Sequence, residues 1–265
     1  MKAHRCGFSS GTPFRQGIAV FIALSFPAFV AHAQMATLPA GQFTMGSAAG
    51  DGDEQPPVSV QLSSFSIDKY EVTRAQYDSC VRQGGCTPAH YADGKCYLWT
   101  NAGFKLVRVP EKFQSPALPV LCVTWEQARQ YCRFKGKQLP TEAQWEYAAL
   151  SGRGNAQYAW GDADPSAANC AQPSELQPRA CGSGPPNPWG LFDMTGNVWE
   201  WTNDRYQRDY YAMGDSIDPQ GPPAGFFRVI RGGGWYSTAP QLRNRNRHWF
   251  DPASAEASVG FRCAR

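Results

Sequence analysis

Residues 196–202, with the sequence GNVWEWT, constrain the fold of this chain more than any other segment. They combine a glycine, two tryptophans and an acidic residue in a stretch too short and irregular for an amphipathic helix. Glycine is required where the backbone takes a positive φ or approaches another group closely. Because Asp193 and Glu200 stand on either side of this glycine turn, the segment predicts a loop wound around a cation.

The first 33 residues have the pattern of a secretory signal peptide. They begin with basic residues and no acids, continue with an apolar run over residues 18–31, and end in the A-x-A cleavage site AHA. The apolar run is too short for a comfortable membrane span, and no second one follows. We therefore expect a cleaved signal peptide over residues 1–33, one domain over residues 34–265, and a periplasmic or secreted protein.

The charge of the expected mature chain is balanced. The leader contains three of the 25 Lys and Arg residues and none of the 22 Asp and Glu residues, which leaves 22 of each sign. No lysine-rich stripe points to a nucleic-acid partner, and no long acidic run points to a basic one.

Eight cysteines follow the leader, and an even number in an exported chain favours disulfides. Eight cysteines allow 105 pairings, so the sequence alone does not fix them. Proximity along the chain favours the following bonds: Cys80–Cys86, Cys96–Cys122 and Cys170–Cys181, which leaves Cys132–Cys263. A zinc site is the alternative, but there is no C-x2-C pair, and His90 and His248 are the only histidines after the leader.

The remaining pattern predicts a single loop-rich α+β domain, because 26 glycines and 21 prolines leave little room for long elements. Threonines at N-cap positions predict helices over residues 73–81, 124–134 and 141–150, the last two opened by capping boxes. Short strands are expected over the following ranges: 42–45, 58–65, 198–202, 227–231 and 259–264.

Seven blocks of the chain resemble, in order, those of the formylglycine-generating enzyme family, the sulfatase-modifying factors. The blocks are LPAGQFTMGS (38–47), IDKYEVTRAQYDSCV (67–81), PVLCVTWEQARQYCRFKGKQLPTEAQWEYAA (119–149), YAWGD (158–162), GLFDMTGNVWEW (190–201), RVIRGGGW (228–235) and GFRCAR (260–265). The resemblance implies that family's variant of the C-type lectin fold. It also supports the Cys132–Cys263 bond independently.

The family's copper-dependent enzymes oxidise a cysteine of sulfatase precursors to formylglycine, with copper bound between two cysteines. The matching positions here are Ser237 and Leu242, give or take one residue. Gly234 stands in place of a family serine and Ser258 in place of an asparagine, whereas Trp199 matches. Because Cu(I) is a soft ion that prefers thiolates, we predict no copper–thiolate site.

The resemblance also implies a structural calcium ion. Its ligands would be the carboxylates of Asp193 and Glu200 and the backbone carbonyls of Met194, Gly196 and Val198. The alternative is a metal-free turn in which Asp193 caps and Glu200 forms a salt bridge. A second calcium site is only weakly indicated by Asn169, because a downstream aspartate is missing.

Three arginines, Arg243, Arg245 and Arg247, alternate with asparagines after residue 242. On an extended strand they would share one face and, beside Trp235, Tyr236 and Trp249, line a cleft for an anionic or peptide ligand. The alternative is that they stack on tryptophans and pair with surface acids.

Other catalytic centres are weakly indicated. A two-histidine, one-carboxylate iron site would need His90 and His248 to converge, and no G-x-S-x-G motif is present. The leading hypothesis is an exported, non-copper family member that binds a peptide or small ligand as an accessory or maturation factor. The alternatives are a thiol-independent periplasmic oxidase, similar to the family member that matures the pyoverdine chromophore, a formylglycine-generating enzyme, and a ligand-display protein similar to the C-type-lectin-fold proteins of diversity-generating retroelements.

Overall fold

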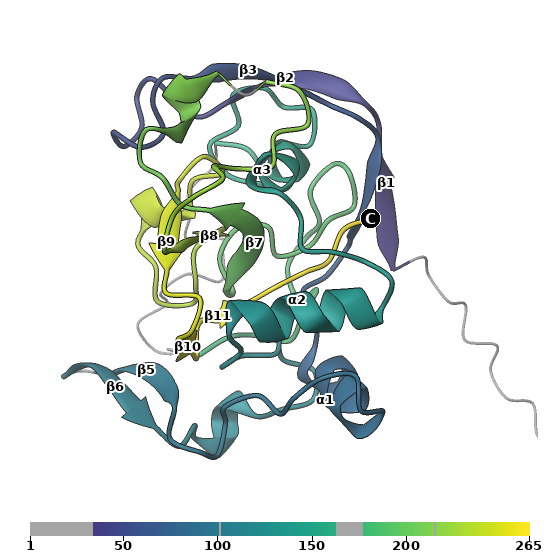
Figure 1. The fold of residues 1–265 in the computed structure, drawn as a ribbon, viewed down its shortest axis with the longest axis vertical. Coiled ribbons are helices and arrows are strands. Elements are labelled where there is room, and N and C mark those ends of the chain that lie inside the picture. Colours follow the sequence, from purple (N-terminus) through teal and green to yellow (C-terminus); the bar gives the residue numbers. More distant parts are fainter. Residues whose placement is uncertain (1–33, 101, 163–176, 215) are drawn as a thin grey trace, which may run out of the picture. The chain divides into compact units, whose positions relative to one another are not determined.

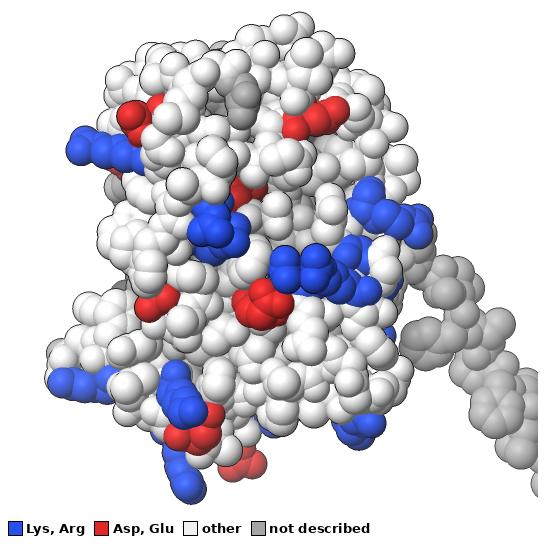
Figure 2. Space-filling model, in the orientation of Figure 1, with Lys and Arg blue, Asp and Glu red and all other residues white. Residues whose placement is uncertain are grey.

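The computed structural model describes residues 34–100, 102–162, 177–214 and 216–265. In this part of the chain, short helices and strands are joined by long loops, which confirms the loop-rich α+β prediction (Figure 1). None of the helices in it is long and apolar enough to cross a bilayer. Figure 2 shows basic and acidic side chains interspersed on one face, so that face has no stripe of a single charge.

The described residues contain three α-helices, which begin where the sequence predicts them. They are α1 (Arg74–Arg82), α2 (Trp125–Phe134) and α3 (Glu142–Leu150). In each helix, the side chain of the N-cap threonine accepts a hydrogen bond from the backbone N–H of the glutamine three positions later. The side chain of that glutamine accepts a hydrogen bond from the backbone N–H of the threonine, which completes a capping box. These contacts are local, and for that reason the pattern found all three starts.

Two antiparallel pairs form the first part of the domain: β2 (Gly41–Met45) with β3 (Val58–Leu62), and β1 (Met35–Leu38) with β4 (Phe65–Asp68). The single strand expected over residues 58–65 is therefore two strands. Ser63 lies between them, and both its N–H and its hydroxyl donate to the carboxylate of Asp218. This contact holds the chain between the two strands, which pair with different partners.

The central sheet has the order β11 (Val259–Gly260), β7 (Trp199–Arg205), β8 (Arg228–Arg231) and β9 (His248–Phe250). The strands predicted near residues 198–202, 227–231 and 259–264 are confirmed, although β11 is shorter than expected. Residues 243–247, considered as an extended strand, instead form a bend and turns after the short 3-10 helix η4 (Ala239–Leu242).

A hairpin of β5 (Cys96–Thr100) and β6 (Gly103–Val107) was not predicted. It extends away from the central sheet in Figure 1, and its inner strand pairs in parallel with β10 (Ala255–Glu256). Two other 3-10 helices, η1 (Glu111–Phe113) and η3 (Tyr210–Met213), lie in the connecting loops.

The core contains two large apolar clusters and a small one of Tyr158 and Leu242. One large cluster packs α1 and α2 against the central sheet around Tyr77, Trp199 and Phe261, and the other packs α3 against β1–β4 around Trp145. These large rings are at most 1% exposed. A chain with few long elements buries much apolar area in such rings.

Among the described residues, three disulfides are present, namely Cys80–Cys86, Cys96–Cys122 and Cys132–Cys263. The Cys132–Cys263 bond joins α2 to the C-terminal segment. The predicted partner of Cys181, Cys170, lies outside the described residues.

Candidate functional site

The two positions that match the family's copper cysteines lie together in the core. A Cβ atom built at Gly233 would lie 2.7 Å from Leu242 Cδ2 and 3.4 Å from Ser237 Cβ. Both side chains are buried, and the Ser237 hydroxyl accepts a hydrogen bond from the backbone N–H of Gly234 at 2.9 Å. Ser237 is therefore engaged in holding the turn that follows β8.

Three other predicted pocket positions also converge. A Cβ atom at Gly234 would lie 3.1 Å from Trp199 Cδ1 and 3.3 Å from Ser258 Cβ. The neighbouring Trp235 is buried and donates its indole N–H to the carbonyl of Ala257 at 2.9 Å. The glycine thus allows the backbone after β8 to approach Trp199 closely.

A pocket of about 260 Å³ opens beside this cluster. Its walls are mostly aromatic, and the residues that line it are Phe104, Trp199, Ile230, Tyr236, Gln241, His248, Trp249, Phe250 and Glu256. We call it the aromatic pocket. Trp199, Tyr236 and Trp249 were predicted from the sequence to lie at a ligand cleft, whereas the other six were not.

Glu256 is the acidic group of the aromatic pocket. Its Oε1 accepts hydrogen bonds from the hydroxyls of Tyr236, at 2.9 Å, and of Ser258. Trp199 in turn hydrogen-bonds to Tyr236. No described residue donates to Oε2 of Glu256, and this oxygen is therefore available to a ligand.

Sequence reasoning missed Glu256, although one signal was available. Glu256 and Ser258 are two residues apart in an extended segment, a spacing that places side chains on one face. The backbone that carries this carboxylate is held firmly. Strand β10 pairs with β5, and the backbone carbonyl of Glu256 accepts a hydrogen bond from the N–H of Cys122 at 3.1 Å. The Cys96–Cys122 disulfide joins the two segments that make these contacts.

No cationic side chain neutralises Glu256 among the described residues. Burial raises the pKa of its carboxyl group above the ordinary value, and only the hydrogen bonds from Ser258 and Tyr236 oppose this. The ring of His248 lies 5.2 Å from that of Trp199, and burial lowers the pKa of His248, so it is neutral at pH 7. The aromatic pocket therefore contains one acidic side chain, and no positively charged side chain among the described residues pairs with it.

The three alternating arginines are used inside the protein. Arg243 binds Glu54 through two hydrogen bonds of 2.8 and 2.7 Å, and Arg247 binds both oxygens of Glu142 at 2.8 and 3.0 Å. Arg245 lies 3.8 Å from Glu146. All three carboxylates are buried rather than on the surface. None of the arginines lines the aromatic pocket, although Arg243 and Arg245 line a separate pocket of about 270 Å³.

The two histidines do not form an iron site. Nδ1 of His90 lies 2.6 Å from Oδ2 of Asp93, and the ring of His248 packs against that of Trp199 at an interplanar angle of 45°. Within the described ranges, no group of three or more His, Cys, Asp or Glu side chains is placed to hold a metal ion.

Comparison with known proteins identifies the family. The family model for the sulfatase-modifying factor enzyme 1-like domain matches residues 24–265. The chain belongs to this family. It is 34% identical to the formylglycine-generating enzyme of Streptomyces coelicolor, over 86% of this chain and 87% of the relative. It is also 32% identical to the inactive C-alpha-formylglycine-generating enzyme 2 of mouse, over 88% and 87% of the two chains.

The fold of the family is confirmed as well. PvdO from Pseudomonas aeruginosa has 27% identity and a TM-score of 0.70, over 87% of this chain and 93% of its own. The domain is thus the formylglycine-generating-enzyme variant of the C-type lectin fold. Because one relative is named inactive and another is named an enzyme, membership alone does not decide the activity.

The loop at residues 193–200 contains an excess of buried negative charge. Arg262 binds both oxygens of Glu200, at 2.6 and 2.7 Å, and is its salt-bridge partner. Burial and the charges of nearby carboxylates raise the pKa of Glu71 and of Asp193. One guanidinium thus faces three carboxyl groups, and Oε1 of Glu71 is buried without a hydrogen-bond partner.

This loop also has free backbone oxygen atoms. Asp193 and Asn197 take positive φ angles of 57° and 60°, which turn the chain tightly on both sides of Gly196. The carbonyls of Met194 and Gly196 accept no hydrogen bond from a described residue. Excess negative charge and open carbonyl oxygens fit the chemistry of calcium. Asn169, assigned to the weaker second site, lies outside the described residues.

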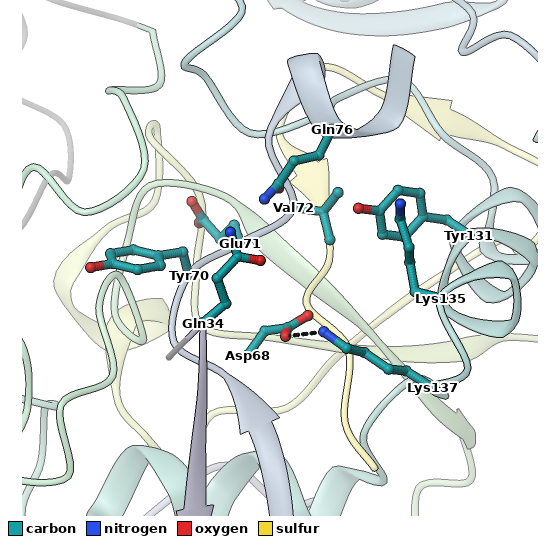
Figure 3. Close-up of a pocket in the computed structure, with 9 residues that line it drawn as sticks. All are labelled: Gln34, Asp68, Tyr70, Glu71, Val72, Gln76, Tyr131, Lys135 and Lys137. Carbon is teal, nitrogen blue, oxygen red and sulfur yellow. Dashed lines mark hydrogen bonds and ion pairs between the residues drawn. The ribbon is translucent and has the colours of Figure 1, made fainter. Parts of the chain in front are cut away.

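Figure 3 shows a different pocket, of about 330 Å³, beside β4 and the start of α1. In it, Asp68 points to Lys137, whose Nζ lies 2.5 Å from Oδ1, while Oδ2 accepts from the N–H of Cys263. This carboxylate is neutralised within the chain, unlike Glu256. The other acid of this pocket, Glu71, accepts a hydrogen bond from the side-chain amide of Asn197 and lies at the predicted calcium loop. The aromatic pocket, whose acid has no other assigned role, is therefore the stronger candidate for a functional site.

Proposed function

We propose that the chain is an exported, copper-independent member of the formylglycine-generating enzyme family that binds a peptide or small ligand, as an accessory or maturation factor. One observation carries the proposal. The family's active-site neighbourhood contains a 260 Å³ aromatic pocket with a buried acid, while Ser237 and Leu242 replace the copper cysteines. A hydroxyl and an isobutyl group offer Cu(I) no soft ligand.

In this proposal, a calcium ion bound by the loop of residues 193–200 stabilises the aromatic pocket indirectly. Asp193 and Glu200 would hold the ion with their carboxylates, and Met194, Gly196 and Val198 with their carbonyls. The ion would neutralise the excess charge of the loop next to β7. Since β7 begins with Trp199, a fixed loop would help to fix one wall of the pocket.

Ligand binding is tested by titrating the purified mature chain with a panel of aromatic, anionic and cationic small molecules and short peptides. Tryptophan fluorescence is a suitable signal, because Trp199 and Trp249 line the pocket. We expect at least one member to bind, and Tyr236→Phe to weaken it. Absence of binding by any panel member, with the protein folded, would contradict the proposal.

Copper independence and export have separate tests. Titration with Cu(I) should show no tight binding, and a cysteine-containing sulfatase peptide should remain unmodified. Mass spectrometry of the protein from the periplasm or medium should find Gln34 as the first residue. Tight Cu(I) binding or formylglycine in the peptide would favour the family's enzymatic activity instead.

A second candidate is an oxidase that works without thiols. It is favoured by Glu256, because a buried carboxylate with an open oxygen can accept a proton from a bound substrate. Each panel compound that binds the protein should then be incubated with it, and the consumption of dioxygen should be measured. Turnover that Glu256→Gln abolishes would favour the oxidase, whereas binding without turnover would favour the accessory role.

A further inference from the structure

The aromatic pocket contains one acid whose counter-charge is missing. Glu256 forms no ion pair with a described residue, although four other buried glutamates, Glu54, Glu142, Glu146 and Glu200, each have an arginine partner. The remaining buried glutamate, Glu71, accepts a hydrogen bond from the side-chain amide of Asn197 and lies at the predicted calcium loop. The hydrogen bonds of Glu256 come from two neutral hydroxyls, both to Oε1. An unpaired buried carboxylate is costly unless it is protonated or meets a cation.

The charged side chains of the surrounding elements are directed elsewhere. Arg247, which precedes β9, binds the buried carboxylate of Glu142 in α3. Lys105 follows Phe104 in β6, so the two side chains point to opposite faces of the hairpin. Arg228 of β8 lies over the ring of Trp125 at 3.6 Å. The part of the chain that the structure describes thus provides no cation for Oε2 of Glu256.

The aromatic rings that form the walls of the pocket also favour the binding of a cation. The rings of Phe104 and Tyr236 are 6.0 Å apart in an edge-to-face arrangement, and Trp99 extends the cluster at 5.0 Å from Phe104. Phe104 is 44% exposed and Trp99 42%, so the cluster is open to solvent. The negative faces of such rings attract ammonium groups, most strongly when the ligand is desolvated.

We infer that the aromatic pocket binds an organic cation, an ammonium group that lies against Phe104, Trp199 and Tyr236 and pairs with Oε2 of Glu256. The inference rests on the proposed function and names its ligand class. The ammonium group belongs either to a small amine or to a lysine side chain of a peptide. Both sources have the same recognition chemistry, a positive charge with an apolar surface.

The experiment is calorimetric titration of the mature chain, with its disulfides intact, using two matched pairs of probes. The first pair is choline and dimethylbutanol, its neutral isostere with carbon in place of nitrogen. The second pair is a capped Gly-Lys-Gly peptide and the same peptide with norleucine. We expect at least one cation to bind about tenfold more tightly than its neutral partner, which corresponds to about 1.4 kcal/mol. Choline alone would assign a small amine, and the lysine peptide alone a peptide ligand.

Two variants distinguish the contribution of the Glu256 charge to binding from that of an aromatic ring. Glu256→Gln and Phe104→Leu should each weaken cation binding about tenfold and leave the neutral probes unchanged. Phe104 is exposed on the hairpin, so its replacement leaves the core intact. Glu126→Gln, which removes an exposed acid from α2, is the control for overall charge and should have no effect.

The inference is overturned if the neutral probes bind as tightly as the cations, or if Glu256→Gln leaves cation binding unchanged. It is also overturned if no cation binds while a neutral or anionic member of the wider panel does. In that case the proposed function survives. If nothing in either set binds to the folded protein, both fail together.

Discussion

Replacing Asp204 with asparagine is expected to remove a large pH dependence from the stability of this protein. Asp204 is buried in β7, and its Oδ2 accepts a hydrogen bond from the N–H of Glu142 at 2.7 Å. Burial, together with the charge of Glu142, raises the pKa of Asp204 to about 8. Burial also acts on Glu142, but Arg247 and Arg231 outweigh it and lower the pKa of Glu142. The pair therefore has one ionised and one protonated carboxyl group at pH 7.

The sign and size of the effect follow from this shift. The folded protein keeps a proton on Asp204 that the unfolded chain, with a pKa of about 3.9, releases. Stability therefore falls as the pH rises from about 4 to about 8, by about 1.4 kcal/mol per pH unit. Over the four units the loss is about 5.5 kcal/mol, which is comparable to the whole stability of many domains.

Urea unfolding at pH 5, 6 and 7, with the disulfides intact, measures this directly. Asp204→Asn keeps an acceptor for the Glu142 N–H but cannot ionise. The difference in unfolding free energy between the variant and the natural protein should therefore move in favour of the variant by about 1.4 kcal/mol for each pH unit. Asp78→Asn, at an exposed acid in α1, is the control and should follow the natural protein. Parallel curves for Asp204→Asn and the natural protein would show that Asp204 is ionised when folded, and would refute the reasoning.

Three further outcomes are expected. Replacing Cys132 and Cys263 together by serine opens a connection of 131 residues, and urea unfolding should show a loss of about 4–5 kcal/mol; an unchanged midpoint would contradict this. Arg262→Met leaves Glu200 buried without its cation and should cost about 3–5 kcal/mol in the same assay, whereas a loss below 1 kcal/mol would mean that the pair is dispensable. Chelation of calcium should lower the melting temperature of the natural protein, calcium should restore it, and Asp193→Asn should show neither response. A melting temperature of the natural protein that ignores both chelator and calcium would contradict the calcium proposal.

The parts of the fold that the sequence predicted are those fixed by neighbouring residues. Each capping box needs only a threonine and a glutamine three positions apart, and all three helices begin there. The short disulfide Cys80–Cys86 is similarly local. The β5–β6 hairpin escaped notice because its strands do not alternate clearly and its inner edge is completed by β10, more than 150 residues later.

The candidate site was harder to predict because its chemistry depends on distant partners. Arg243 was interpreted as a ligand-binding side chain, but its acid, Glu54, lies 189 residues earlier in the chain. Conversely, the only local sign at Glu256 is its two-residue spacing from Ser258, which does not by itself indicate function. It becomes conspicuous only because hydroxyls of Tyr236 and Ser258 reach it while no arginine does. Spacing shows which residue types are present, but not which charges are left unpaired.

The structural role of Ser237 and Leu242, at the positions that the resemblance matches to the copper cysteines, depends on where these side chains lie. Ser237 does not face an open pocket as a spare nucleophile, since it is fully buried and its hydroxyl is tied to the N–H of Gly234. That bond holds the turn whose glycine lets Trp199 and Ser258 approach, and both of these side chains belong to the hydrogen-bonded group around Glu256. The position that the family resemblance matches to a copper cysteine thus forms part of the support for a neighbouring acid in this chain. Restoring a cysteine at Ser237 alone should therefore disturb the pocket before it creates any affinity for copper.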